Sequence, residues 1–202
     1  NFIAGAQPRA IASGDFEGDG KLDIVVANTN DNTVSVYRNT STTGVISFAV
    51  KVDFATDVQP LDVAVADFDG DGKPDIAIAD GSLLPSNVSI LRNTGTGTIA
   101  FAPRTDIAIL LAVSNLAVGD LNGDNKPDIG ALSIAGNLMI VLTNNSTPGT
   151  ISFPTITNYA TGTAPGGLMI GDIDGDNKHD IAYANFFDQS LFVYRNTSSG
   201  ST

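Results

Sequence analysis

Four short segments gather most of the acidic residues of this chain at a spacing that suits metal coordination. Residues 15–23, 67–75, 120–128 and 172–180 together hold fifteen of the 22 Asp and Glu residues. Each segment follows the pattern Asp-x-(Asp/Glu/Asn)-x-Asp-(Gly/Asn)-Lys-x-Asp. A tight turn can aim the alternating side chains at positions 1, 3 and 5 at one point. Carboxylates gathered in this way repel one another, so the pattern predicts a bound cation.

The other positions of the segment also suit a loop wrapped around an ion. Position 4 is Gly in every copy, and position 6 is Gly20, Gly72, Asn125 or Asn177, the residue types that best tolerate positive φ. The backbone carbonyl of the Lys at position 7 can then point inward while its ammonium stays in water. The last Asp closes the coordination shell.

An all-oxygen shell with three or four carboxylates favours calcium over magnesium. Zinc is disfavoured because His179 is the one nitrogen ligand in the sequence. We therefore expect about four structural calcium ions. The expected ligand residues are Asp15, Glu17, Asp19, Lys21, Asp23, Asp67, Asp69, Asp71, Lys73, Asp75, Asp120, Asn122, Asp124, Lys126, Asp128, Asp172, Asp174, Asp176, Lys178 and Asp180.

The acidic segment has two competing interpretations, an EF-hand and an ordinary hairpin turn. An EF-hand needs Glu at position 12, where this chain has Val26, Ile78, Ala131 and Tyr183. Ordinary Asp-Gly hairpin turns are common in β-proteins and explain one copy well. Four copies in register favour the calcium loop.

The acidic segments belong to a longer internal repeat. They start 52, 53 and 52 residues apart, and the flanking sequence keeps the same register. Arg-Asn pairs, for example, recur after the first, second and fourth segments at 38–39, 92–93 and 195–196. The chain is thus predicted to be a single segment, 1–202, of repeats at about 2–53, 54–106, 107–158 and 159–202.

Each repeat has the pattern of four short strands. A small apolar strand such as 61–66 precedes the acidic segment, and a second apolar run such as 76–79 follows it. A third strand alternates, as at 33–37, and an outer strand is expected from 46–48 through 54. The predicted fold is an all-β propeller of four-stranded antiparallel blades, either a four-bladed ring or part of a larger propeller. The sequence ends before a fourth outer strand, so we expect either a fragment of a larger propeller or an assembly that another copy completes.

At the acidic segments and their flanking strands the chain resembles the FG-GAP or VCBS repeat family, which also forms the propeller of integrin α-subunits. The resemblance covers essentially the whole chain and is nearest to bacterial surface proteins. It implies a β-propeller, usually of seven blades, in a secreted or cell-surface protein. It also implies calcium in the loop between the first and second strands of each blade. Glu17 departs from the usual Asp or Asn, and Asn122 lowers the charge of the third loop.

Composition limits the partners. A formal net charge of −12 argues against nucleic acid and anionic membrane surfaces, and there is no Cys for disulfides or thiolate chemistry. The sequence lacks a run of about 18 apolar residues, so membrane insertion is not expected. A secretion leader is also missing, so we expect that it was removed or lies outside this sequence.

The function predicted from the sequence is extracellular binding or adhesion, with a protein or carbohydrate as ligand. Variable loops opposite the acidic segments would contact it, with Phe186, Phe187, Asn30 and Asn137 as candidate residues. An enzyme is not expected, because no nucleophile and base stand out and His179 is interpreted as an exposed loop residue. The alternatives are purely structural spacer repeats of a large surface protein, or a propeller enzyme.

Overall fold

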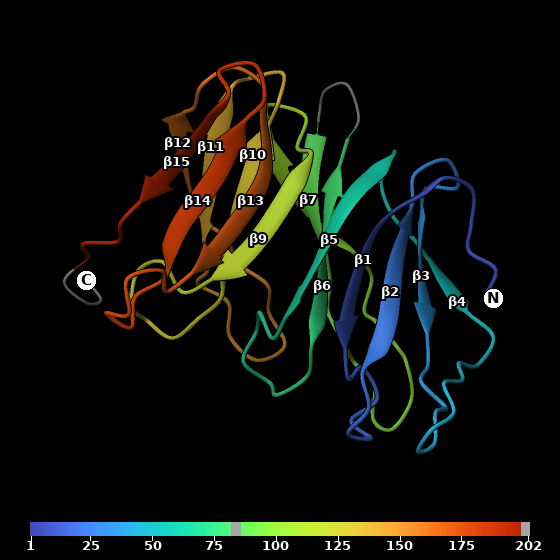
Figure 1. Cartoon of the computed structure of the whole chain (residues 1–202). Helices are drawn as coiled ribbons and strands as arrows, with labels where there is room; N and C mark the ends of the chain where they lie inside the picture. Colours follow the sequence, from blue (N-terminus) through green and yellow to red (C-terminus); the bar gives the residue numbers. More distant parts are fainter. Residues whose placement is uncertain (82–85, 199–202) are drawn as a thin grey trace.

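The computed structural model describes residues 1–81 and 86–198, and these residues form four antiparallel β-sheets with no helix. We call the sheets blades 1 to 4 in chain order (Figure 1). Blade 1 contains β1 (Pro8–Gly14), β2 (Asp23–Asn28), β3 (Thr33–Tyr37) and β4 (Val52–Ala55). Blade 2 contains β5 (Pro60–Ala66), β6 (Asp75–Asp80), β7 (Ser86–Leu91) and β8 (Thr105–Ile109). Blade 3 contains β9 (Asn115–Gly119), β10 (Asp128–Ser133), β11 (Leu138–Thr143) and β12 (Thr155–Ala160), and blade 4 contains β13 (Pro165–Gly171), β14 (Asp180–Asn185) and β15 (Ser190–Tyr194).

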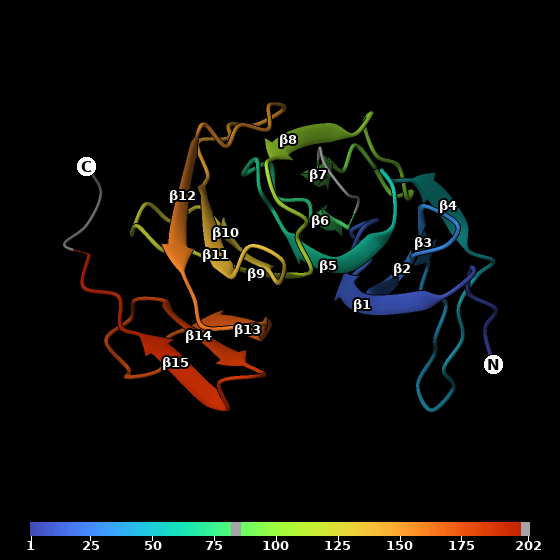
Figure 2. The ribbon, with the colours of Figure 1, turned by 90° about the horizontal axis from the view of Figure 1, so that it is seen from above.

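The blades stand side by side in an open arc. Seen from above in Figure 2, β1, β5, β9 and β13 gather on the inner side of the arc, while β4, β8 and β12 lie on its outside. Each blade orders its strands as they occur in the sequence, so a simple meander is repeated four times. The arc is not closed: blade 1 and blade 4 are its two ends, and blade 4 has three strands among the described residues.

Alternation along the strands gives every blade two apolar faces. We call the face toward the preceding blade the head face and the face toward the following blade the tail face. In β2, Val25 and Ala27 are on the tail face and pack with Ile76 and Ile78 on the head face of blade 2. Equivalent clusters join blade 2 to blade 3 and blade 3 to blade 4. Because side chains alternate with period 2, one short apolar run supplies both interfaces.

The outer strand is shorter than the sequence predicts. Residues 46–48 form no strand but belong to a loop that is closed by isolated bridges between Asn39 and Phe48 and between Thr42 and Val45. The outer strand starts at Val52, and the predicted boundary between residues 53 and 54 falls inside it. The backbone of this loop makes hydrogen bonds within the loop, for example from Thr40 N–H to the Ser47 carbonyl (2.9 Å), and so does not extend the sheet.

Candidate metal centres

The acidic segments form the loops between the first and second strands of the four blades, which is where the repeat pattern places them. Positions 4 and 6 of every loop have positive φ, from 63° at Asn125 to 86° at Gly72. The Gly and Asn residues expected to allow a sharp turn therefore do so. No side-chain or backbone atom would contact a Cβ at Gly70 or Gly72, so it is the backbone conformation that requires these residue types.

The first Asp of each loop organises the turn. In blade 2, Oδ1 of Asp67 accepts the backbone N–H groups of Gly70 (2.8 Å) and Asp71 (3.1 Å), and Oδ2 accepts that of Gly72 (2.8 Å). Asp15, Asp120 and Asp172 make the same three bonds in their loops. Four independent copies thus adopt one local geometry.

Two of the loops bring three carboxylates together. One oxygen each from Asp67, Asp69 and Asp71 lie within 4.8 Å of one another, and Asp172, Asp174 and Asp176 make the same arrangement. The described part of the chain has no such carboxylate triad at the other two loops. In loop 3, Asn122 replaces the middle carboxylate; its Nδ2 donates to Oδ2 of Asp124 (3.2 Å). In loop 1, Glu17 is almost fully buried and lies near Arg38.

The last Asp of each loop hydrogen-bonds to two other backbone segments of its blade. Oδ2 of Asp75 accepts the backbone N–H of Phe68 (2.9 Å), and Oδ1 accepts that of Asn93 (2.7 Å). Asp23, Asp128 and Asp180 repeat both bonds. Both oxygens already serve the backbone, so coordination by this residue stays a prediction.

The pKa shifts of these last aspartates have the same direction in blades 1 to 3 and the opposite direction in blade 4. Burial raises the pKa of Asp75 to about 7, despite the two backbone bonds that oppose the shift. Burial likewise raises the pKa of Asp23 and of Asp128. In blade 4, at the open end, backbone bonds from Asn196 and Ile173 instead lower the pKa of Asp180.

The Arg residues that recur after the loops contact the acid at position 3. Arg38 lies 3.7 Å from Glu17, Arg92 lies 3.8 Å from Asp69, and Arg195 pairs with Asp174. Arg195 also approaches Asp176 at 3.0 Å. Each guanidinium group therefore offsets part of the negative charge of its loop. The recurrence of the Arg-Asn pair was visible in the sequence, but its contact with the loop was not predicted.

The loop lysines do not extend freely into water. Nζ of Lys21 contacts Asp19 at 3.0 Å, and that of Lys73 lies 3.7 Å from Asp71. In the other two loops the ammonium donates to a backbone carbonyl, from Lys126 to Ser146 (2.9 Å) and from Lys178 to Ser198 (2.5 Å). Their expected metal contact is through the main-chain oxygen, which these side-chain bonds leave available.

The Asn of the same pair, and Asn144 after Thr143 at the equivalent place in the third repeat, join neighbouring blades. Nδ2 of Asn93 donates to the Pro74 carbonyl of its own blade (3.1 Å) and to the Phe16 carbonyl of blade 1 (2.9 Å). Asn144 bridges Pro127 and Phe68, and Asn196 bridges His179 and Leu121, at 2.9 to 3.0 Å. We call these three contacts the junction asparagine bridges. They tie each acidic loop to the next one.

The candidate ligand-binding residues divide into two kinds. Phe186 and Phe187 are 76% and 67% exposed and contact each other edge to face, so they are accessible. Asn30 is exposed, and its backbone N–H donates to the Ala6 carbonyl (3.2 Å). Asn137 is exposed too, but its side-chain oxygen accepts the backbone N–H of Ala164 at the junction with blade 4 (3.0 Å).

The prediction that His179 is an exposed loop residue is wrong. Its side chain is half-buried, and Nδ1 accepts the backbone N–H of Asp120 (2.9 Å) from blade 3. A Cβ added at Gly119 would lie 2.7 Å from the same nitrogen. The residue therefore helps join two acidic loops, where the absence of a side chain at Gly119 makes room for the ring.

An open arc of meander sheets, with an acidic turn at the same position of every blade, defines a β-propeller-like repeat protein. The family model for the FG-GAP-like repeat matches residues 15–78 and 78–131, which is more than half of the chain. The chain belongs to the FG-GAP-like repeat family. A comparison with curated proteins finds no match.

Solved structures agree on the fold. The crystal structure of BBS1N in complex with ARL6DN, soaked with lead, superposes with a TM-score of 0.63 at 16% identity, over 100% of this chain and 57% of that chain. Virginiamycin B lyase from Staphylococcus aureus, as the selenomethionine protein, gives 0.51 at 14% identity over 96% and 57%. The chain therefore spans a little over half the length of these proteins. At such identities the likeness establishes the fold alone.

Proposed function

We propose that this chain is a calcium-binding β-propeller module that works outside the cell in binding or adhesion, with calcium as a structural element. The observation that carries the proposal is the approach of three carboxylate oxygens to within 4.8 Å in loops 2 and 4. An oxygen-only donor set of this charge suits a hard cation that accepts six to eight ligands. The residues present thus fit the ion that the family implies.

In each loop the side chains at positions 1, 3 and 5 and the backbone carbonyl at position 7 would hold the ion. The last Asp would be a further ligand. The bound cation would neutralise carboxylates that otherwise repel one another. Since calcium would bind the folded loop and not the unfolded chain, each occupied site adds about 2.7 kcal/mol when free calcium is a hundred times its dissociation constant. Loops 2 and 4 should bind most tightly, and loop 3, with Asn122, more weakly.

Two observations support the binding role: the exposed position of Phe186 and Phe187, and the structural similarity to BBS1N. Phe186 and Phe187 offer exposed aromatic surface on the loop between β14 and β15, opposite the acidic loops. BBS1N, which shares the fold, was crystallised in complex with the protein ARL6DN. No helix formed by the described residues is long and apolar enough to cross a membrane. The exposed Phe186 and Phe187 and the complex formed by BBS1N make a protein our first choice of ligand, with carbohydrate second, and we propose no catalytic role.

Calorimetry of thermal unfolding, in calcium and in chelator, tests the proposal when the bound ions are counted in the same preparation. We expect close to four ions per chain and a clear rise in the unfolding midpoint with calcium. The Phe186→Ala, Phe187→Ala double variant should keep both properties. If no ion is bound and the unfolding midpoint does not shift, the loops are ordinary hairpin turns, and the spacer function becomes the better explanation.

A further inference from the structure

A series of hydrogen bonds connects the acidic loops of neighbouring blades. In loop 1, the Phe16 N–H donates to Oδ2 of Asp23 (3.0 Å), and the Phe16 carbonyl accepts a hydrogen bond from Nδ2 of Asn93 in blade 2 (2.9 Å). The Asn93 backbone N–H donates to Oδ1 of Asp75 (2.7 Å), and Oδ2 of that aspartate accepts the N–H of Phe68 in loop 2 (2.9 Å). The series therefore runs without a break from one acidic loop to the next.

The series is repeated at both later junctions and reaches loop 4. In each loop the residue at position 2 donates its N–H to the last Asp of the same loop. In loops 1 to 3 its carbonyl accepts a hydrogen bond from the asparagine of the following blade. From Phe68 onward all distances are 2.7 to 3.0 Å, and the series continues through Asn144, Asp128, Leu121, Asn196, Asp180 and Ile173.

This hydrogen-bond series passes through the candidate metal centres. The residue at position 2 lies between the expected ligands at positions 1 and 3, as Phe68 does between Asp67 and Asp69. The last Asp, which accepts the N–H of position 2, is an expected ligand as well. A loop that closes around a cation therefore fixes the carbonyl to which the asparagine of the next blade donates. A loop that opens withdraws this carbonyl.

The bridging asparagines cannot follow a moving acceptor without losing hydrogen bonds. Asn93 is fully buried, and besides the two bonds of its amide nitrogen, its Oδ1 accepts the N–H of Gly95 (2.8 Å). Asn144 is equally buried, and its Oδ1 accepts the N–H of Ser146 (2.8 Å). Both polar atoms of each side chain are hydrogen-bonded, so a shift of the acceptor carbonyl leaves a buried polar group without its partner.

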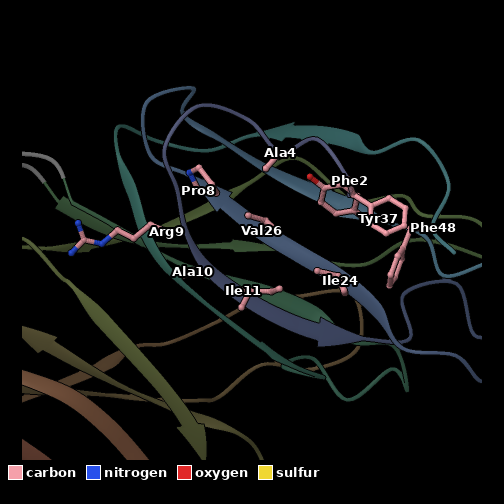
Figure 3. Close-up of a pocket in the computed structure, with 10 residues that line it drawn as sticks. All are labelled: Phe2, Ala4, Pro8, Arg9, Ala10, Ile11, Ile24, Val26, Tyr37 and Phe48. Atoms are coloured by element: carbon pink, nitrogen blue, oxygen red, sulfur yellow. The ribbon is translucent and has the colours of Figure 1, made fainter. Parts of the chain in front are cut away.

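Paired strands fix the distance between each acidic loop and the asparagine of the same blade. In blade 1, Oδ1 of Asp23 at the start of β2 accepts the N–H of Asn39, which follows β3 (2.7 Å). The cross-strand pair of Ile24 and Tyr37, drawn in Figure 3, stands beside this bond. The equivalent residues pair in the same register in the other three blades. The sheet therefore transmits a displacement of the asparagine to the last Asp.

We propose that calcium binding to neighbouring loops is positively cooperative and that the junction asparagine bridges carry the coupling; the inference rests on the calcium-binding function proposed above. A closed loop supplies the carbonyl that holds the next asparagine, so each closed loop favours closure of its neighbour. One buried hydrogen bond corresponds to about a fivefold gain in calcium affinity at each junction. Repulsion between ions in neighbouring loops has the opposite sign, so the sign of the coupling identifies its cause.

Site-resolved calcium titration by NMR tests the coupling between loops 2 and 3. The backbone amide signals of Gly72 and Asn125, at position 6 of the two loops, report the two sites separately. Asp71→Asn should empty loop 2 and lower the calcium affinity of loop 3 about fivefold. In the Asn144→Ala background, which lacks the bridge between these loops, Asp71→Asn should leave the calcium affinity of loop 3 unchanged.

Asn93→Ala is the matched control, because it removes the same bonds at the junction between loops 1 and 2. In that background the coupling between loops 2 and 3 should survive, whereas Asp71→Asn should no longer affect loop 1, whose site is read at Gly20. This second comparison also decides the matter if Asn144→Ala does not fold.

The coupling is overturned if emptying loop 2 strengthens loop 3, leaves it unchanged, or weakens it equally with and without the Asn144 bridge. Ions that bind to the four loops independently would contradict the coupling alone. The absence of any calcium-dependent change in the loop signals would contradict the proposed calcium function as well, so the two failures are distinguishable.

Discussion

The hydroxyl oxygen of Ser89 lies 2.9 Å from Oδ1 of Asp106 and is also hydrogen-bonded to the carboxyl group of Asp80. Because one hydroxyl proton can be donated to only one of these carboxyl groups at a time, the arrangement favours a proton on Asp80, which is fully buried. Blade 1 has the same chain of groups, but there Nδ2 of Asn28 donates to Ser35 (2.8 Å), and Ser35 donates to Asp53 (2.6 Å). A protonated Asp80 would therefore donate a hydrogen bond to Ser89, as the Asn28 amide does to Ser35.

This arrangement predicts that stability falls as pH rises. Burial raises the pKa of Asp80 to about 7; the hydrogen bond from Ser89 and the charge of Arg104 oppose this shift, while the nearby Asp57 and Asp106 add to it. The folded chain holds a proton that the unfolded chain releases at its ordinary value of 3.8, so stability is lost between about pH 4 and 7 and stays low above it.

Asp80→Asn should remove the part of that loss that comes from Asp80, whereas Asp75, whose pKa burial also raises to about 7, keeps its own part. We expect the variant to be more stable than the wild type at pH 8, by at most about 4 kcal/mol, and nearly equal to it at pH 4. Chemical denaturation at several pH values measures this. The reverse change in blade 1, Asn28→Asp, should introduce the same pH dependence; if neither variant alters it, Asp80 is not the group that titrates.

Calcium stabilisation should depend on the loop carboxylates and not on acidic charge in general. Asp71→Asn is expected to lose one bound ion and about 2 to 3 kcal/mol at saturating calcium. Asp57→Asn removes the same charge outside the loops, where Oδ2 of Asp57 accepts a hydrogen bond from Asn87 (2.7 Å), and should keep every ion. Unfolding in calcium and in chelator compares them, and equal losses in calcium would argue against the structural role of the ion.

The junction asparagine bridges should stabilise the arc. Asn93→Ala removes the donor to the Phe16 carbonyl as well as the bond inside blade 2, whereas Asn39→Ala removes only the bond inside blade 1. Because a buried carbonyl left without a donor costs about 1 to 3 kcal/mol, Asn93→Ala should destabilise the chain by that much more than Asn39→Ala. Chemical denaturation of the two variants under the same conditions makes the comparison.

The sixth loop position should accept Asn but not Ala. Gly72 has φ of 86°, and the equivalent Asn177 has 64°. Gly72→Ala should cost about 1 to 2 kcal/mol because the left-handed conformation brings Cβ toward the following carbonyl, while Gly72→Asn should cost a few tenths. Thermal unfolding of the two variants decides this. Since nothing lies within 4 Å of a Cβ there, a large loss in both would have to come from the calcium site.

The sequence by itself determined the repeat, the strand-loop-strand frame and the positive-φ turns, because these depend on local spacing and on residues such as Gly20, Gly72 and Asn125. Local spacing also placed the acidic side chains at positions 1, 3 and 5 of each loop.

Tertiary structure decided what links one repeat to the next. Asn93 and Phe16 are separated by 77 residues, and Asp120 and His179 by 59, so no local pattern predicts their contacts. The sequence shows that Arg38, Arg92 and Arg195 recur; only the packed blades show that they reach the position-3 acids.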